Sequence, residues 1–190
     1  MSPTTHLLAS WLVAAKTTDN LRDRRLVALA GVAPDLDGLG LIVDLCKGGD
    51  PYYYPMYHHW LGHGLVGALV CAGILTCFAE RKRRTFFLIL LTFHLHLLCD
   101  LVGSRGPEPK DIWPIYYFGP LSYRPIWRWA HQWALDGWQN YVISLGLFVW
   151  SMALAVKTGD SIIGVFNHKA DRIFVETLRK WRAKLISPKN

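Results

Sequence analysis

The chain has 190 residues, of which 52% are hydrophobic and 13% aromatic, and its formal net charge is +7. This apolar and aromatic content exceeds that of a typical soluble domain, so the positive charge is attributed to an anionic membrane surface and no nucleic-acid partner is expected. The four cysteines have no CxxC spacing, which argues against a disulfide frame or a zinc knuckle.

Five apolar segments follow one another along the chain, and none shows the strict alternation of a β-barrel strand. They cover residues 7–15, 26–43, 61–79, 85–102 and 138–156. The first two are short or interrupted and are expected to be half-spanning or re-entrant, whereas the last three approach the roughly 20 residues that cross a bilayer. The predicted fold is an all-α integral membrane bundle with about three spanning helices.

The hydrophilic parts of the chain differ from one another. Residues 103–129 are rich in Pro, Gly, Trp and Tyr, a composition that breaks regular helix and is typical of a membrane–water interface. After Val156 the chain becomes basic, and the spacing of Phe174, Leu178 and Trp181 predicts an amphipathic tail helix on a membrane surface. We therefore divide the chain into a membrane-embedded domain, residues 1–156, and a basic tail, residues 157–190.

Positive charge is concentrated in three regions. Sixteen of the 21 Lys and Arg residues lie between the first two segments, between the third and fourth, or after Val156. If each segment reverses the chain, these regions share one side of the membrane, which the positive-inside rule makes cytoplasmic. The sequence therefore predicts a multi-pass protein of a bacterial inner, cytoplasmic membrane, with its basic loops and C-terminus in the cytoplasm.

The same topology gathers ionisable side chains towards the outer face. They are His6, Asp35, Asp37, His58, His59, His63, His96 and Asp100. His96 and Asp100 are spaced i, i+4, which places both on one helix face. A single such pair is explained by a buried hydrogen bond, but three segments bring ionisable groups to one level, and such groups in membrane segments mark function. Mixed imidazole and carboxylate ligands favour zinc, manganese or iron over calcium.

Other polar residues receive different interpretations. His94 is expected to be structural, bonded to a backbone carbonyl, and His168 lies in the basic tail. His131 is also placed outside the site. An approach to the site is the alternative, because His131 and Asp136 lie just before the fifth segment. Arg105 leaves two alternatives open, a ligand for a substrate phosphate and a solvated loop residue.

Taken in order, these motifs resemble the inner-membrane-associated, metal-dependent hydrolase family whose best-known bacterial member is under LexA control. The matching motifs span about residues 1–155 and are Thr5-His6-Leu7-Leu8, Pro34-Asp35-Leu36-Asp37, His58-His59-Trp60-Leu61-Gly62-His63, His96-Leu97-Leu98-Cys99-Asp100 and the Trp113-Pro114 loop. Where the family has His-Arg-Gly-x-Thr-His, His59 replaces the Arg and Gly62 the Thr. This departure leaves open the substrate class and the choice between His58 and His59 as ligand.

The resemblance implies a membrane-bound hydrolase that uses metal-activated water on a phosphoester or lipid-linked substrate. One or two divalent ions are expected, zinc first with manganese or iron as alternatives, held by His6, Asp35, Asp37, His58, His63, His96 and Asp100. The predicted catalytic residues are Asp37, His96 and Asp100, with Asp37 preferred as bridging carboxylate or general base. Two alternatives remain: a non-catalytic metal-binding or structural membrane protein, and an anchor that recruits a partner through its basic tail.

Overall fold

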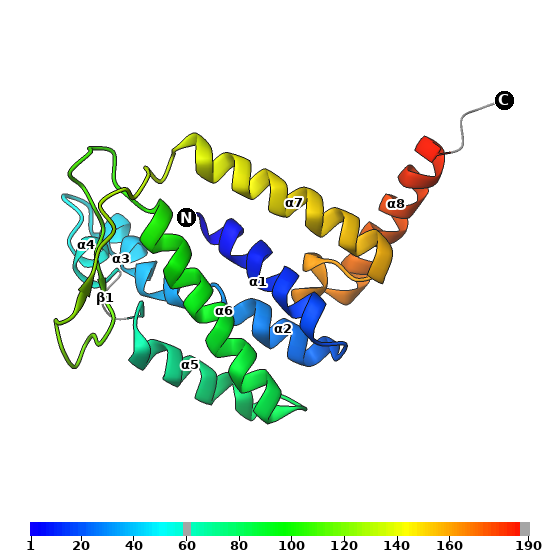
Figure 1. Ribbon diagram of the computed structural model, residues 1–190, viewed down its shortest axis with the longest axis horizontal. Helices are drawn as coiled ribbons and strands as arrows, with labels where there is room; N and C mark the ends of the chain where they lie inside the picture. The colour runs from blue at the N-terminus through cyan, green and yellow to red at the C-terminus, as the bar shows by residue number, and fades with distance from the viewer. Residues whose placement is uncertain (59–61, 187–190) are drawn as a thin grey trace.

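The computed structural model describes residues 1–58 and 62–186, and helices dominate it (Figure 1). The α-helices are α1 (Pro3–Thr17), α2 (Leu21–Ala30), α3 (Gly40–Lys47), α4 (Tyr53–Tyr57), α5 (Leu65–Cys77), α6 (Lys82–Gly103), α7 (Trp138–Thr158) and α8 (His168–Ile186), with 3-10 turns η1 (Pro34–Leu39) and η2 (Ile162–Val165). The helical fold class predicted from the sequence is confirmed.

Among the described residues, two helices are long and apolar enough to cross a bilayer, α6 with 22 residues and α7 with 21. Helix α2 and the segment Pro34–Lys47 make a third span if they count as one, bent by 56° at the break. Helix α5 has 13 residues, fewer than a crossing needs, so the expectation of a spanning helix over residues 61–79 is wrong. The helix begins only at Leu65, whose amide is held by the carbonyl of Tyr117 at 2.7 Å.

Helix α1 occupies the centre of the bundle, where it packs against α2, α6 and α7 (Figure 1). Pro3 opens the helix, and the hydroxyl of Ser2 caps it by accepting a hydrogen bond from the amide of Thr5 at 3.3 Å. Further along, Trp11 is completely buried. This central position explains why His6, near the start of α1, is only 1% exposed.

The basic regions meet at one end of the bundle (Figure 1). The carboxylate of Asp23 in α2 accepts hydrogen bonds from the amides of Glu80 and Arg81, at 2.8 and 3.1 Å, and so holds the loop just before α6. Arg24 pairs with Asp160, just beyond α7, at 2.5 Å. These contacts join the start of α2 to the α5–α6 loop and to the segment just after α7, so the three basic regions lie together, as the segment count predicted. The cytoplasmic assignment of this end stays a prediction.

At the opposite end, the connection between α6 and α7 contains a small hairpin that the sequence did not predict. Strand β1 (Ile115–Tyr116) pairs antiparallel with β2 (Ile126–Trp127). The hydroxyl of Tyr117, next to β1, lies 3.0 Å from Nε2 of His94, whose Nδ1 lies 2.7 Å from the carbonyl oxygen of Leu90. The structural role predicted for His94 is therefore confirmed.

Helix α8 leaves the basic end at an angle to α7 (Figure 1). Its Asp171 and Val175 are buried, whereas Ile173, Trp181 and Leu185 are exposed. Phe174, Leu178, Trp181 and Leu185 recur at helical spacing on one face, so the helix is amphipathic, as predicted for the tail. Its contact with a membrane surface and the division of the chain at residue 156 stay predictions.

Candidate metal centre

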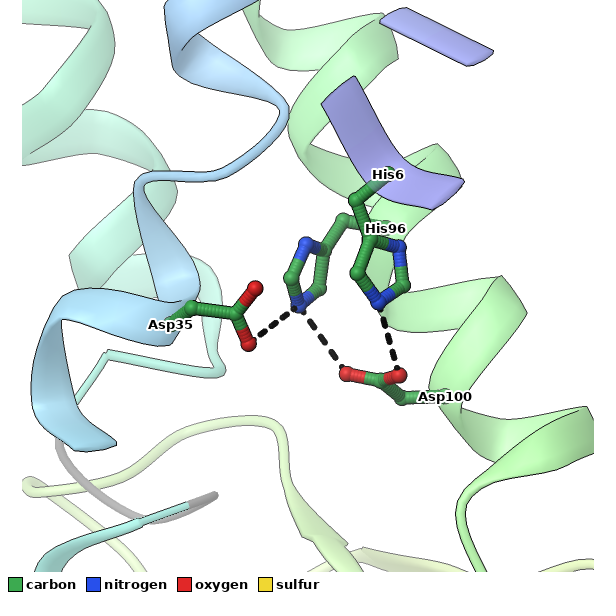
Figure 2. A group of neighbouring side chains, drawn as sticks. All are labelled: His6, Asp35, His96 and Asp100. Carbon is green, nitrogen blue, oxygen red and sulfur yellow. Dashed lines mark ion pairs between the residues drawn. The ribbon is translucent and has the colours of Figure 1, made fainter. Parts of the chain in front are cut away.

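The predicted ligand residues converge at the end of the bundle away from the basic loops. One group, drawn in Figure 2, takes His6 from α1, Asp35 from η1, and His96 and Asp100 from α6, each with a ligand atom within 4.8 Å of the others. A second group that meets the same distance criterion contains Asp37, His58 and His63. The two groups adjoin, because Nε2 of His63 lies 3.2 Å from Nε2 of His96. His59 lies outside the described residues.

Helix α6 presents His96 and Asp100 one turn apart, and Nε2 of His96 lies 2.9 Å from Oδ2 of Asp100. One turn further on, the hydroxyl of Ser104 donates to Oδ1 of Asp100 at 2.8 Å, and the amino group of Met1 also donates to this oxygen. Nε2 of His6 lies 3.1 Å from the same atom. Ser104 is not among the residues predicted from the sequence, although its spacing of four from Asp100 is the same signal that indicated His96.

Asp35 reaches the site because the chain leaves α2 at Gly31 and turns through η1, which begins at Pro34. A Cβ atom on Gly31 would lie 1.6 Å from Oγ of Ser10, so only glycine allows the end of α2 to approach α1 this closely. The same approach brings the carbonyl oxygen of Gly31 to 2.8 Å from Nδ1 of His96. A packing requirement at Gly31 therefore also fixes the orientation of His96.

The imidazoles of His63 and His96 face each other through the same atom, Nε2. Nδ1 of His96 donates to the carbonyl of Gly31, and Nδ1 of His63 donates to a carboxylate oxygen of Asp37 at 2.9 Å, since these oxygens can only accept. In the neutral imidazoles both Nε2 atoms then carry lone pairs. Two such nitrogens 3.2 Å apart in a buried site repel each other, and either a proton or a metal ion between them removes that repulsion.

The donor atoms also have the spacing of a coordination sphere. Ligands about 2.0–2.2 Å from a zinc ion at tetrahedral angles lie roughly 3.4 Å from one another. Nε2 of His63 is 3.4 Å from Oδ2 of Asp100, and Nε2 of His96 is 3.6 Å from Oδ1 of Asp35. Among the described residues, Oδ2 of Asp35 and Nδ1 of His6 are buried without a hydrogen-bond partner. The residues therefore fit a divalent ion.

Charge favours a cation at the same place. The two groups contain three carboxylates and no Lys or Arg side chain, and the amino group of Met1 offsets the charge of Asp100 alone. Burial lowers the pKa of His63, but hydrogen bonds to Asp100 and Asp37 outweigh this effect and raise it to about 9. The carboxylates that favour a proton on His63 also favour a metal ion, which competes with that proton for the imidazole.

Asp37 has surroundings unlike those of Asp35. Its Oδ1 accepts a hydrogen bond from Nδ1 of His58 at 2.7 Å, and its Oδ2 accepts from the amide of Gly62 and from Nδ1 of His63, both at 2.9 Å. A carboxylate that binds the far nitrogen of a ligating histidine fixes the ring and its tautomer. The sequence could not distinguish this arrangement from direct ligation.

A cleft of about 730 Å³ opens beside the two groups. Asp35, Asp100 and His58 line it, together with Tyr54 and Trp113. A volume of this size is typical of small-molecule sites. The carboxylates are therefore reachable from outside the protein, although Asp100 itself is 2% exposed.

A comparison with protein families gives one match, the YdjM inner membrane protein family, over residues 1–163. The chain belongs to this family. The match includes every residue of both ligand groups and supports the predicted inner-membrane location. Searches of curated proteins and of solved structures found no match. The LexA control and the hydrolase activity implied by the sequence resemblance stay predictions for this YdjM-family protein.

The remaining candidates of this YdjM-family chain lie outside the ligand groups. His131 and His168 are exposed. Nε of Arg105 donates to the carbonyl of Gln132 at 3.0 Å, and Arg105 is absent from the described lining of the cleft. Asp136 and Asn140 do line the cleft, but the side-chain amide of Asn140 is bound to backbone carbonyls, including that of Gly103 at 2.9 Å. Of these two residues, Asp136 is therefore the one whose side chain is available to a ligand in the cleft.

Proposed function

We propose that this YdjM-family protein is a membrane-bound, metal-dependent hydrolase of a phosphoester or lipid-linked substrate. The observation that carries the proposal is the facing Nε2 atoms of His63 and His96, beside the carboxylates of Asp35 and Asp100, at the inner end of a cleft. A cation satisfies these donors, and the cleft leaves one side for water and substrate. An accessible side is what separates catalytic from closed structural metal sites.

The chain would hold the ion with His63, His96, Asp100 and Asp35, and His6 adds a further imidazole next to Asp100. When bound, a divalent metal lowers the pKa of its water to about 7 and polarises the scissile group. Imidazole with carboxylate suits zinc, with manganese or iron as alternatives.

For the general base we propose Asp35 in place of the sequence preference, Asp37. Both oxygens of Asp37 accept hydrogen bonds from His58, Gly62 and His63, so its role is to orient the histidines. Asp35 lines the cleft and has an oxygen without a hydrogen-bond partner among the described residues. That oxygen is buried and has no competing donor among the described residues, so it would take a proton from a water molecule bound next to Asp35 at the inner end of the cleft.

A second candidate function is metal binding without catalysis. The observation in its favour is the number of side-chain donors, since His6, His63, His96, Asp35 and Asp100 together are sufficient to fill a coordination sphere, as in structural sites. The two candidates share the ligands and differ in whether water reaches the ion. Only a measurement of substrate turnover distinguishes the catalytic from the non-catalytic candidate.

The test is hydrolysis by detergent-purified protein of a panel of soluble and lipid phosphoesters. We expect activity to disappear in chelator and to return on adding zinc or manganese, and Asp35→Asn to lower turnover by about 10²–10⁴-fold. Activity that persists in chelator contradicts the metal-dependent mechanism. Stoichiometric metal without turnover across the panel favours the non-catalytic candidate.

A further inference from the structure

The cleft beside the ligand groups has two unlike parts. Asp35 and Asp100 lie at its inner end, whereas Leu41 and Ile42 of α3 and Tyr141 of α7 form an apolar border. These border residues are 44%, 57% and 68% exposed, respectively. A polar interior with an apolar entrance suits a ligand that carries a polar head and an apolar chain.

The entrance lies on parts of the chain that qualify as membrane-spanning. Helix α3 belongs to the bent candidate span, and α7 is one of the full-length spans. Helix α3 and the start of α7 lie at the same end of the bundle in Figure 1, and both contribute residues to the cleft. If these segments span the bilayer, the exposed side chains of Ile42 and Tyr141 face lipid, and the cleft opens sideways into the bilayer.

Charge restricts the head of the ligand. No Lys or Arg side chain occurs among the described residues that line the cleft, whereas Asp35, Asp100 and Asp136 do. Met1 also lines the cleft, but its amino group is paired with Asp100, so an anionic group entering from the mouth is held mainly through a cation on the ligand groups. A phosphate is an anion that a divalent ion in this setting can hold and polarise.

We infer that the cleft is a lateral entry site for a phosphate-bearing lipid of the surrounding leaflet, with its head at the His/Asp groups and its acyl chain between Ile42 and Tyr141. The inference rests on the proposed function for the chemistry at the head, but the binding of the chain is testable without turnover. A cleft of about 730 Å³ accommodates the head and the first part of a chain, and the remainder of the chain stays in the bilayer.

The experiment uses the full chain, loaded with zinc, in phosphatidylcholine nanodiscs that contain a phosphonolipid with a diazirine in its acyl chain. The carbon–phosphorus bond of this probe resists hydrolysis, so turnover does not remove it. After illumination, labelled peptides are mapped by mass spectrometry. The variant Ile42→Trp narrows the mouth, and Ile74→Trp is its matched control, because Ile74 lies on α5 away from the cleft and is equally exposed, at 57%.

We expect labels to concentrate in residues 38–42 and around Tyr141, and Ile42→Trp to lower them by about fivefold, while Ile74→Trp has no effect. Excess unlabelled phosphatidic acid should compete, and excess inorganic phosphate should leave the chain labels in place. Labels spread evenly over α3, α5, α6 and α7, or equal effects of the two variants, overturn the inference. Soluble phosphoester hydrolysis, measured in parallel, tests the proposed function separately: activity with evenly spread labels rejects only the lateral entry.

Discussion

Buried and partly buried acids occur at both ends of the bundle, but their partners differ. At the basic end, Asp23 accepts hydrogen bonds from two backbone amides, and Asp160 pairs with Arg24. At the other end, Oδ1 of Asp35 and Oδ2 of Asp100 lie 3.6 and 2.9 Å from Nε2 of His96. The proton of this neutral imidazole is on Nδ1, which donates to the carbonyl of Gly31. The acids at the first end are matched by protein donors, whereas those at the second end meet imidazole nitrogens in a group that could hold a metal ion.

This difference shows what distinguishes a functional site from a structural one in a membrane protein. An ionisable residue in an apolar segment is costly wherever it lies, so burial alone does not indicate function. Carboxylates with matched donors hold loops and helices together. Carboxylates that meet imidazole lone pairs, next to a cleft, create a place for an ion.

The largest expected effect comes from breaking the complete end. Arg24→Met should lower the free energy of unfolding by about 3–5 kcal/mol, because Asp160 is left with its charge unpaired in a largely buried site; the two side chains are 9% and 15% exposed. The metal content of the folded protein should not change. Thermal unfolding in detergent, with elemental analysis of the same samples, tests both statements, and metal loss without unfolding would show that the two ends are coupled.

The same variant has a predicted pH dependence. Burial raises the pKa of Asp160, and Arg24 opposes this effect, so removing Arg24 raises the pKa further. A carboxyl group whose folded-state pKa is raised favours the folded state below its unfolded-state pKa and loses that contribution as pH rises through the folded-state pKa. The destabilisation by Arg24→Met should therefore shrink in acid. A difference from wild type that grows on acidification contradicts this account of Asp160.

A smaller effect is expected at the shell around the ligands. Asp37→Asn should weaken metal affinity by about 10–100-fold, because the Nδ1 atoms of His58 and His63 lose their carboxylate acceptor. Asp44→Asn is the matched control, since Asp44 is a nearby carboxylate bound to backbone amides, including that of Tyr54 at 2.7 Å, and belongs to neither ligand group. Competition with a chelator of known affinity measures both variants. Equal affinity losses would refute an orienting role for Asp37.

The smallest effect is expected at His94, which lies two residues before His96 but has structural partners. His94→Phe removes the contacts to Leu90 and Tyr117 and should lower the free energy of unfolding by about 1 kcal/mol without changing metal stoichiometry. Unfolding and metal content are measured on one preparation. Loss of metal in this variant would mean that the ligand groups are wrongly assigned.

Much of the site followed from the sequence because two simple rules apply to it. Loop charge set the ends of the bundle, and i, i+4 spacing set the shared face of His96 and Asp100. The rest depends on contacts between distant segments. The bend that brings Asp35 inward depends on the close approach of Gly31 to Ser10, and the short α5 depends on Tyr117 from a later loop. Local pattern carries no signal for either contact, nor for the cleft between α3 and α7.

The most direct test of the central claim is elemental analysis of the detergent-purified protein, wild type beside the double variant His96→Ala/Asp100→Ala, with His94→Phe as a control for fold. The wild type and His94→Phe should contain about one zinc, manganese or iron ion per chain, and the double variant should contain almost none. A wild-type protein that holds no metal, even after metal is added back, would contradict the cation site, and the His/Asp groups would then be a buried hydrogen-bond network.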